Sequence, residues 1–297
     1  MTEEKRDCWE IDPLDGRPTA AWMLIDPHRG GYVIAIGGMT AFHIGDEILG
    51  EEVLVWMQER RRVFDKNILL IPIGDEAWFV LTPFYLSTGL LLLTRLPAHA
   101  GDSRVLADED LLGQVSVFEG TAEKVACERG FDRRPAMRWW RRICACLPIP
   151  VAAEQELEET TRLLRATASL NEIRIGRVTA FQPPPSSQEI AAGQLDPYAL
   201  TVLLLLSLSA LRGSGIRHVT PHFEPTEEGT VLVLTAGGID TGLHPEESVE
   251  IPFCRMLAEQ NDQIFSFSVQ DGRAHLMLCT VRKDFALLGV KTEPDLL

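Results

Sequence analysis

The chain has 297 residues, about twice the length of a typical single domain, so two domains are expected. Its 28 Lys and Arg are outnumbered by 43 Asp and Glu, and the formal net charge of −15 disfavours generic nucleic-acid binding, because the molecule as a whole repels phosphate backbones. A charged N-terminus without an apolar leader and six scattered cysteines predict a cytoplasmic protein with reduced thiols.

The first half of the chain predicts an α+β domain. Two short strands are expected between residues 21 and 40, and an amphipathic helix follows at 50–65. The apolar runs NILLIPIG, AWFVLTPFY and TGLLLLTRLP predict three more strands, and the segment 108–130 predicts a helix in its second half. This order indicates a sensory-type domain of PAS-like or GAF-like architecture over residues 1–148.

An arginine-rich segment, ERGFDRRPAMRWWRRICACLP, closes the first half. A guanidinium group can bind a carboxylate or a phosphate through two hydrogen bonds and can stack on an indole ring. The segment is therefore a candidate anion or partner surface. Its candidate residues are Arg133, Arg134, Arg138, Trp139, Arg141 and Arg142. The alternative is a basic, solvated helix face whose tryptophans pack inward and whose arginines, Arg129 included, pair with the acidic stretch Glu154–Glu159 downstream.

A long helix is predicted over residues 151–176, within a connecting segment at 149–181. Leu157, Thr161, Leu164 and Ala168 fall at helical spacing, and glutamates crowd the first turns. This apolar stripe predicts a homodimer through the helix, although the stripe could equally pack within the chain. The prolines of QPPPSSQ, residues 182–188, predict a loop.

The apolar run from Tyr198 to Leu211 predicts a buried helix rather than a membrane span. Its 14 residues fall short of the roughly 20 needed to cross a bilayer. Pro197 suits the first helical turn, and Gly213 and Gly215 end the helix. Further on, TVLVLTAGG predicts a strand, VEIPFCRMLAEQN a helix, and QIFSFSVQDGRAHLMLCTV a β-hairpin.

The order of these elements resembles the core of a sensor histidine kinase. From about Asp196 the chain resembles the ATP-binding domain of the GHKL superfamily, with the phrases SALRGSG, TGLHPEE and FCRMLAEQNDQIFSFS at corresponding places. The resemblance implies a GHKL-like α/β sandwich over residues 182–297. In that family an Asn on the apolar helix holds magnesium, an Asp after the next strand accepts the adenine amino group, and a glycine-rich lid covers the triphosphate.

This chain departs from the family at each of those positions. Ser209 stands at the place of the Asn and is a poor ligand for a hard cation. Gly238 stands at the place of the Asp, with Asp240 two residues later and Gly242 beyond it. In place of the lid the chain has HPEESVEIPF, which contains no glycine and has three acids, Glu246, Glu247 and Glu250.

A phosphoacceptor histidine is also missing, because residues 151–176 contain none. The sequence therefore predicts a non-catalytic regulatory or signalling protein, with no ATP or magnesium cofactor, no metal, no membrane or nucleic-acid binding, and a possible protein partner. The alternative is a nucleotide-binding ATPase or kinase whose rebuilt site reads adenine through Asp240.

Two smaller clusters are candidate metal sites. Cys144 and Cys146 lack a second pair of ligands and are expected to be buried free thiols. His218 and His222 share one face of a predicted strand without a third ligand, and they are expected to be surface residues.

Overall fold

The computed structural model describes most of the predicted elements. Described are residues 21–29, 31–37, 42–49, 66–73, 76–82, 85, 88–96, 120, 123–130, 132–148, 156–177, 179–180, 197–226, 229–237, 248–261, 263–270 and 273–280. The predicted helix at 50–65 and the loop at 182–188 lie outside these ranges.

The first sheet has five strands, all of them predicted from the sequence. They are β1 (Ala21–Asp26), β2 (Tyr32–Gly37), β3 (Ile68–Ile73), β4 (Glu76–Leu81) and β5 (Leu91–Arg95). The order is β2-β1-β5-β4-β3, and every neighbouring pair is antiparallel. A short 3-10 turn at Pro27–Arg29 joins β1 to β2, as the Pro/Gly punctuation predicted.

Both faces of this sheet are buried, with side chains alternating along each strand. Leu24 and Leu92 belong to the face that packs against the helices, while Met23 and Leu91 belong to a second cluster on the opposite face. That second face is covered in part by the segment 42–49, where Phe42 makes an edge contact with Trp78. The sequences of these strands are therefore nearly continuous apolar runs, and they lack the alternation of apolar and polar residues that a half-exposed strand shows.

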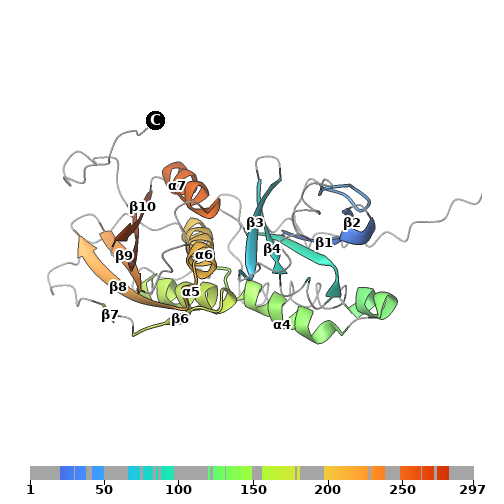
Figure 1. Cartoon of the computed structure of the whole chain (residues 1–297), viewed down its shortest axis with the longest axis horizontal. Helices are drawn as coiled ribbons and strands as arrows, with labels where there is room; N and C mark the ends of the chain where they lie inside the picture. Colours follow the sequence, from blue (N-terminus) through green and yellow to red (C-terminus); the bar gives the residue numbers. More distant parts are fainter. Residues whose placement is uncertain are drawn as a thin grey trace, which may run out of the picture.

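Helices follow the first sheet in the described part of the chain. They are α4 (Arg133–Cys144), α5 (Glu156–Leu170), α6 (Pro197–Gly213) and α7 (Glu250–Gln260), and residues 123–129 are also helical. In Figure 1 α5, α6 and α7 lie between the two sheets, and α4 runs along the lower edge of the first sheet.

Helix α6 is the buried helix that its sequence predicts. It begins at Pro197 and is apolar all round, so residues such as Leu204 and Leu208 are buried on every side. It ends in a Schellman motif, where Gly215 has φ +84° and the Ile216 amide donates to Leu211. No helix in the described part of the chain combines the length and the apolar character needed to cross a bilayer.

Helix α5 ends earlier than the sequence predicts. The prediction of one helix to residue 176 is wrong at its C-terminal end, since α5 stops at Leu170 and Arg174–Ile175 form strand β6. Glu172 has φ +55°, and the Ile173 amide donates to Ala168, again a Schellman motif. Because the left-handed residue is a glutamate rather than a glycine, composition gives no signal for this helix end.

The second sheet is mixed. Its strands are β6, β7 (Thr179–Ala180), β8 (His218–Thr226), β9 (Gly229–Gly237), β10 (Gln263–Gln270) and β11 (Arg273–Thr280). The order is β10-β11-β9-β8-β6, with β7 also paired to β8; β6 and β7 run parallel to β8, and the other pairs are antiparallel. The predicted hairpin is confirmed as β10 and β11, paired up to Gln270 and Arg273.

One apolar core joins the two sheets. Its buried members include Trp22 on β1, Phe79 on β4, Leu203 on α6 and Leu276 on β11. The α+β class expected from the sequence is confirmed in coarse terms. The packing is continuous across residue 148, and the division into domains at 1–148, 149–181 and 182–297 stays a prediction.

Candidate functional site

Ser209, which stands where the resemblance places a magnesium ligand, faces protein rather than open space. Its side chain lies on α6 and is fully buried. The hydroxyl donates to the carbonyl oxygen of Ile68 over 2.9 Å, and its oxygen lies 3.4 Å from Oε1 of Glu250. Ile68 begins β3, so the first sheet supplies the group that meets this hydroxyl.

A buried ion pair lies beside that contact. Nζ of Lys66 is 2.7 Å from Oε1 of Glu250 in the first turn of α7, and the acid side chain is 1% exposed while that of the lysine is 22% exposed. A buried carboxylate is tolerated only with such a partner, because desolvation penalises an unpaired charge by several kcal/mol. Lys66 therefore supplies the cation that the buried carboxylate of Glu250 needs.

Asn67, which lies between Lys66 and Ile68 in the sequence, contacts helix α5. Nδ2 of Asn67 donates to the carbonyl of Leu170 at the end of α5 over 3.0 Å. The carbonyl of Asn67 in turn accepts from the amide of Thr82. We call Lys66, Asn67 and Ile68, together with Ser209 and Glu250, the β3 junction. Three consecutive residues thus bind α7, α5 and α6 in turn.

The other predicted nucleotide positions are not described. Gly238, Asp240 and Gly242 lie outside the described residues, as do Glu246 and Glu247. Of the predicted positions, the structure therefore brings together Ser209 and Glu250. Sequence reasoning missed Lys66 and Asn67, because two polar residues ahead of an apolar strand carry no signal for contacts more than a hundred residues away.

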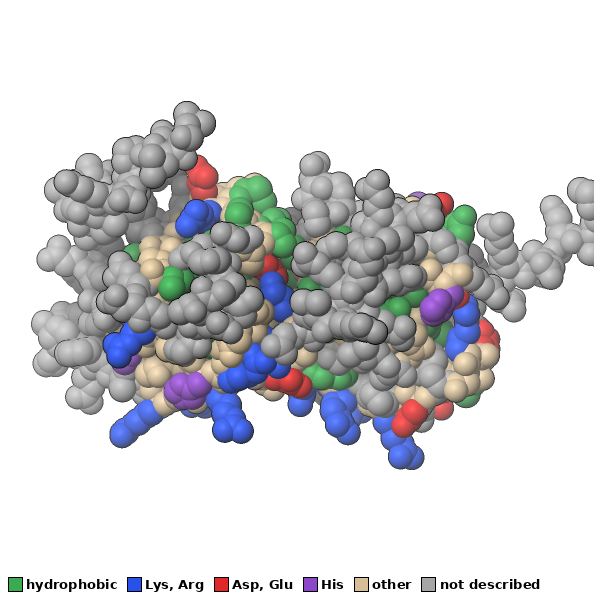
Figure 2. Space-filling view, viewed as in Figure 1, with side chains coloured by type: hydrophobic (Ala, Val, Ile, Leu, Met, Phe, Trp, Pro, Cys, Tyr) green, Lys and Arg blue, Asp and Glu red, His purple; other side chains and the backbone are tan. Residues whose placement is uncertain are grey.

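The arginine-rich segment has an exposed basic face on α4. Arg134, Arg138 and Arg141 are exposed on α4, and Arg142 stacks on Trp139 with its guanidinium carbon 4.6 Å from the ring centroid. Basic side chains project along the lower edge of the molecule, where α4 lies (Figure 2). The backbone of Arg133 begins the helix, while its side chain lies outside the described residues.

The inward face of the same helix is core. Trp140 is fully buried and makes an edge contact with Trp22, the ring centroids being 6.2 Å apart. In the acidic stretch, Oε2 of Glu159 is 2.5 Å from Nε of Arg162 within α5, and the predicted pairing of the α4 arginines with this stretch stays a prediction. Arg129 instead pairs with the buried Asp26 at the end of β1, over 2.7 Å.

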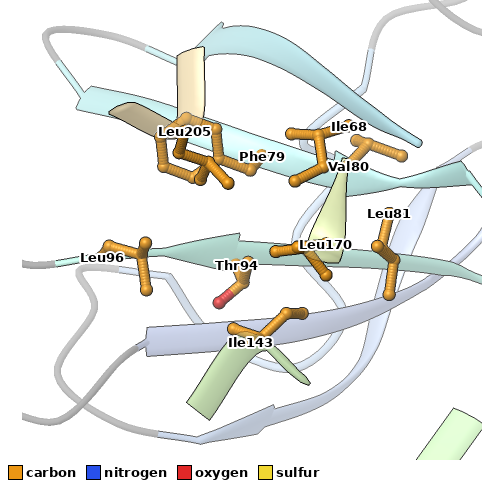
Figure 3. A pocket seen from close by; sticks show the side chains of 9 residues that line it. All are labelled: Ile68, Phe79, Val80, Leu81, Thr94, Leu96, Ile143, Leu170 and Leu205. Carbon is orange, nitrogen blue, oxygen red and sulfur yellow. The ribbon is translucent and has the colours of Figure 1, made fainter. Parts of the chain in front are cut away.

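A small apolar cavity lies between the first sheet and the helices (Figure 3). It is lined by Ile68, Phe79, Val80, Leu81, Thr94, Leu96, Ile143, Leu170 and Leu205. The Thr94 hydroxyl donates to the carbonyl of Ala21. With no charged group in its lining, the cavity offers nothing to a phosphate or a metal ion.

The buried cysteines of the described chain are protonated thiols of low reactivity. Cys144, Cys146 and Cys254 are buried free thiols. Burial raises the pKa of Cys146 and of Cys254 to about 12, and burial, with a smaller effect of Cys146, raises the pKa of Cys144 above the usual thiol range. These side chains stay protonated near neutral pH and behave as small apolar residues.

The two histidines of β8 differ in exposure. His218 is exposed, as expected, whereas His222 is half-buried. Among the residues that the structure describes, no three His, Cys, Asp or Glu side chains gather closely enough to hold a metal ion.

Comparison with known proteins finds similarity only to solved structures, and that similarity is low. No family model and no curated protein matches the chain. The blue-light activated histidine kinase of Erythrobacter litoralis EL346 is 10% identical, with a TM-score of 0.33 over 87% of this chain and 98% of that one. A bacterial phosphotransferase is 13% identical, with a TM-score of 0.31 over 59% of this chain and 98% of that one.

A third solved structure is the histidine kinase ThkA in complex with the response regulator protein TrrA. It is 10% identical, with a TM-score of 0.28 over 89% of this chain and 96% of that one. Likeness at this level carries no argument about the fold, the chemistry or the partners of this chain.

Proposed function

We propose that this chain is a non-catalytic regulatory or signalling protein built on a histidine kinase-like scaffold. The observation that carries the proposal is the β3 junction. Ser209 donates to a backbone carbonyl of β3, and Lys66 pairs with Oε1 of Glu250, so the Ser209 hydroxyl and this carboxylate oxygen already have partners within the chain. A phosphate-bound magnesium ion would need to displace a strand of the first sheet.

The finer parts of the proposal concern organisation. The first sheet, with five antiparallel strands, would belong to a PAS-like or GAF-like sensory domain, and the β3 junction would transmit its state to the three helices. The protein would act in the cytoplasm through a protein partner. The predicted homodimer gains no support from Leu164 and Ala168, which are fully buried within the chain, so a dimer would need the exposed side of α5.

Titration calorimetry with ATP and ADP in the presence of magnesium tests the non-catalytic assignment. We expect no binding heat and no thermal shift at millimolar nucleotide, with an active histidine kinase titrated in parallel as the positive control. Incubation with γ-labelled ATP should leave no phosphoryl group on the chain.

Micromolar binding that Asp240→Ala abolishes would instead establish the alternative, a nucleotide-binding ATPase or kinase with a rebuilt site. Gly242→Ala serves as the matched variant, because it changes a residue two positions further along the chain without removing a carboxylate. Light scattering on the purified chain tests the homodimer, and a strict monomer over the micromolar range would contradict it.

A further inference from the structure

The outer face of α4 concentrates positive charge in a chain that is negative as a whole. Arg134, Arg138 and Arg141 are exposed at positions i, i+4 and i+7, which lie on one side of a helix. The opposite side, which includes Trp140 and Ile143, is buried in the core. We call the three exposed arginines, together with the Trp139–Arg142 stack, the α4 arginine face.

This arrangement is unfavourable for the isolated helix. Like charges four residues apart repel, and α4 contains no acidic residue to offset them. A chain with a net charge of −15 has ample acidic residues for mixed surface pairs, yet none lies within this helix. Three guanidinium groups gathered on one exposed helix face, in a chain that is acidic as a whole, favour an acidic ligand.

The type of basic residue on α4 indicates which chemical group the face would bind. All five basic residues of α4 are arginines and none is lysine, and arginine presents a planar fork of donors that binds a carboxylate with two parallel hydrogen bonds. Stacking on Trp139 holds the Arg142 guanidinium in one orientation. Arginine and tryptophan together are the residues most enriched where binding energy concentrates at protein interfaces.

We propose that the α4 arginine face binds an acidic segment of a partner protein. The rise of about 1.5 Å per residue places Arg134 and Arg141 about 10 Å apart along α4, which matches carboxylates repeated at one face of a partner helix. A nucleic acid is disfavoured because its long phosphate backbone would also meet the negative remainder of the molecule. This proposal is independent of whether the chain binds nucleotide.

Fluorescence anisotropy with a labelled acidic peptide tests the proposal on the full chain. The probe is a helical peptide with glutamates at i, i+4 and i+7, and its control is the same peptide with glutamines. We expect binding of the glutamate peptide only, weakening severalfold between about 0.05 and 0.3 M salt as charges are screened.

Charge-reversal variants locate the site. Arg134→Glu with Arg138→Glu should weaken binding at least about tenfold, since two attractive contacts become repulsive. The matched control is Arg255→Glu with Arg273→Glu, an equal change of net charge at exposed arginines of α7 and β11, for which we expect less than about a twofold effect. Should the first variant fail to fold, Arg134→Lys with Arg138→Lys keeps the charge, and an intermediate loss is then expected because lysine lacks the fork.

Three results would overturn the proposal. One is equal loss of binding in the two charge-reversed variants, which would show only a general effect of net charge. Another is tighter binding of duplex RNA or anionic vesicles than of the peptide, competing at the same face. The third is peptide binding that appears only after Asp108, Glu109 and Asp110 are neutralised, which would assign the face to a segment of this chain.

Discussion

Lys66 and Glu250 are 184 residues apart in the sequence and meet in the space beside Ser209. The ion pair, the Ser209 hydroxyl and the Ile68 carbonyl form one hydrogen-bonded group. At the residue scale, the chemistry here is that of a packed junction, since each described donor of the group has a protein acceptor.

We expect Lys66→Met to destabilise the chain by about 2–4 kcal/mol, because it leaves a nearly fully buried carboxylate without its cation. The range is set below the full cost of breaking a buried pair, since the lysine is partly exposed. Urea denaturation measures the change. Combining Lys66→Met with Glu250→Gln should recover part of the loss, and a single-variant cost below about 0.5 kcal/mol would show that the pair is not coupled.

The buried thiols predict a decline of stability at alkaline pH. Their folded pKa values are raised by burial, so the full contribution is present below the unfolded thiol pKa of 9.0 and is lost as pH rises toward about 12. The free energy of unfolding should fall by up to about 1.4 kcal/mol per pH unit for each such thiol.

Urea titrations between about pH 7.5 and 10.5 measure this slope. Cys254→Ala should reduce it, while Cys127→Ala, at an exposed thiol, should not. An unchanged slope in Cys254→Ala would contradict the assignment to burial.

Helix α4 has two faces with opposite roles. Trp140 is fully buried against Trp22, whereas Arg138 is exposed. We expect Trp140→Ala to cost about 3–5 kcal/mol through a core cavity, and Arg138→Ala to change stability by less than about 0.5 kcal/mol. Thermal unfolding of both variants checks this contrast, and comparable losses would mean that the arginine face contributes to folding rather than to binding.

The C-terminus of α5 carries a left-handed glutamate. Glycine adopts this conformation without strain, so Glu172→Gly should stabilise the chain by about 1 kcal/mol relative to Glu172→Ala. The comparison with alanine removes the effect of losing the carboxylate, which lies 3.8 Å from Arg212. Equal stabilities of the two variants, measured by urea denaturation, would argue against the motif.

The whole molecule is joined by one apolar core from the first sheet through the helices to the second sheet. Such a core predicts a single cooperative unfolding transition. All six tryptophans precede residue 141, so their fluorescence follows the first half while far-ultraviolet dichroism follows both. We expect the two signals to coincide in urea, and separate midpoints would show that the halves unfold independently.

Local pattern was sufficient for most elements. The strands of the first sheet, α6, α7 and the β10–β11 hairpin were predicted because each is marked by apolar periodicity and by proline or glycine at its ends. The end of α5 was not predicted, because Glu172 takes a left-handed conformation that is usual for glycine and not for glutamate.

Composition and the order of neighbouring residues were enough to predict the α+β class and the apolar character of α6, because both depend on local pattern. Only the tertiary structure decided what meets Ser209. The contacts of Lys66, Asn67 and Ile68 with three distant helices arise from how the first sheet docks on them, and docking is a property of packed surfaces that no short stretch of sequence contains.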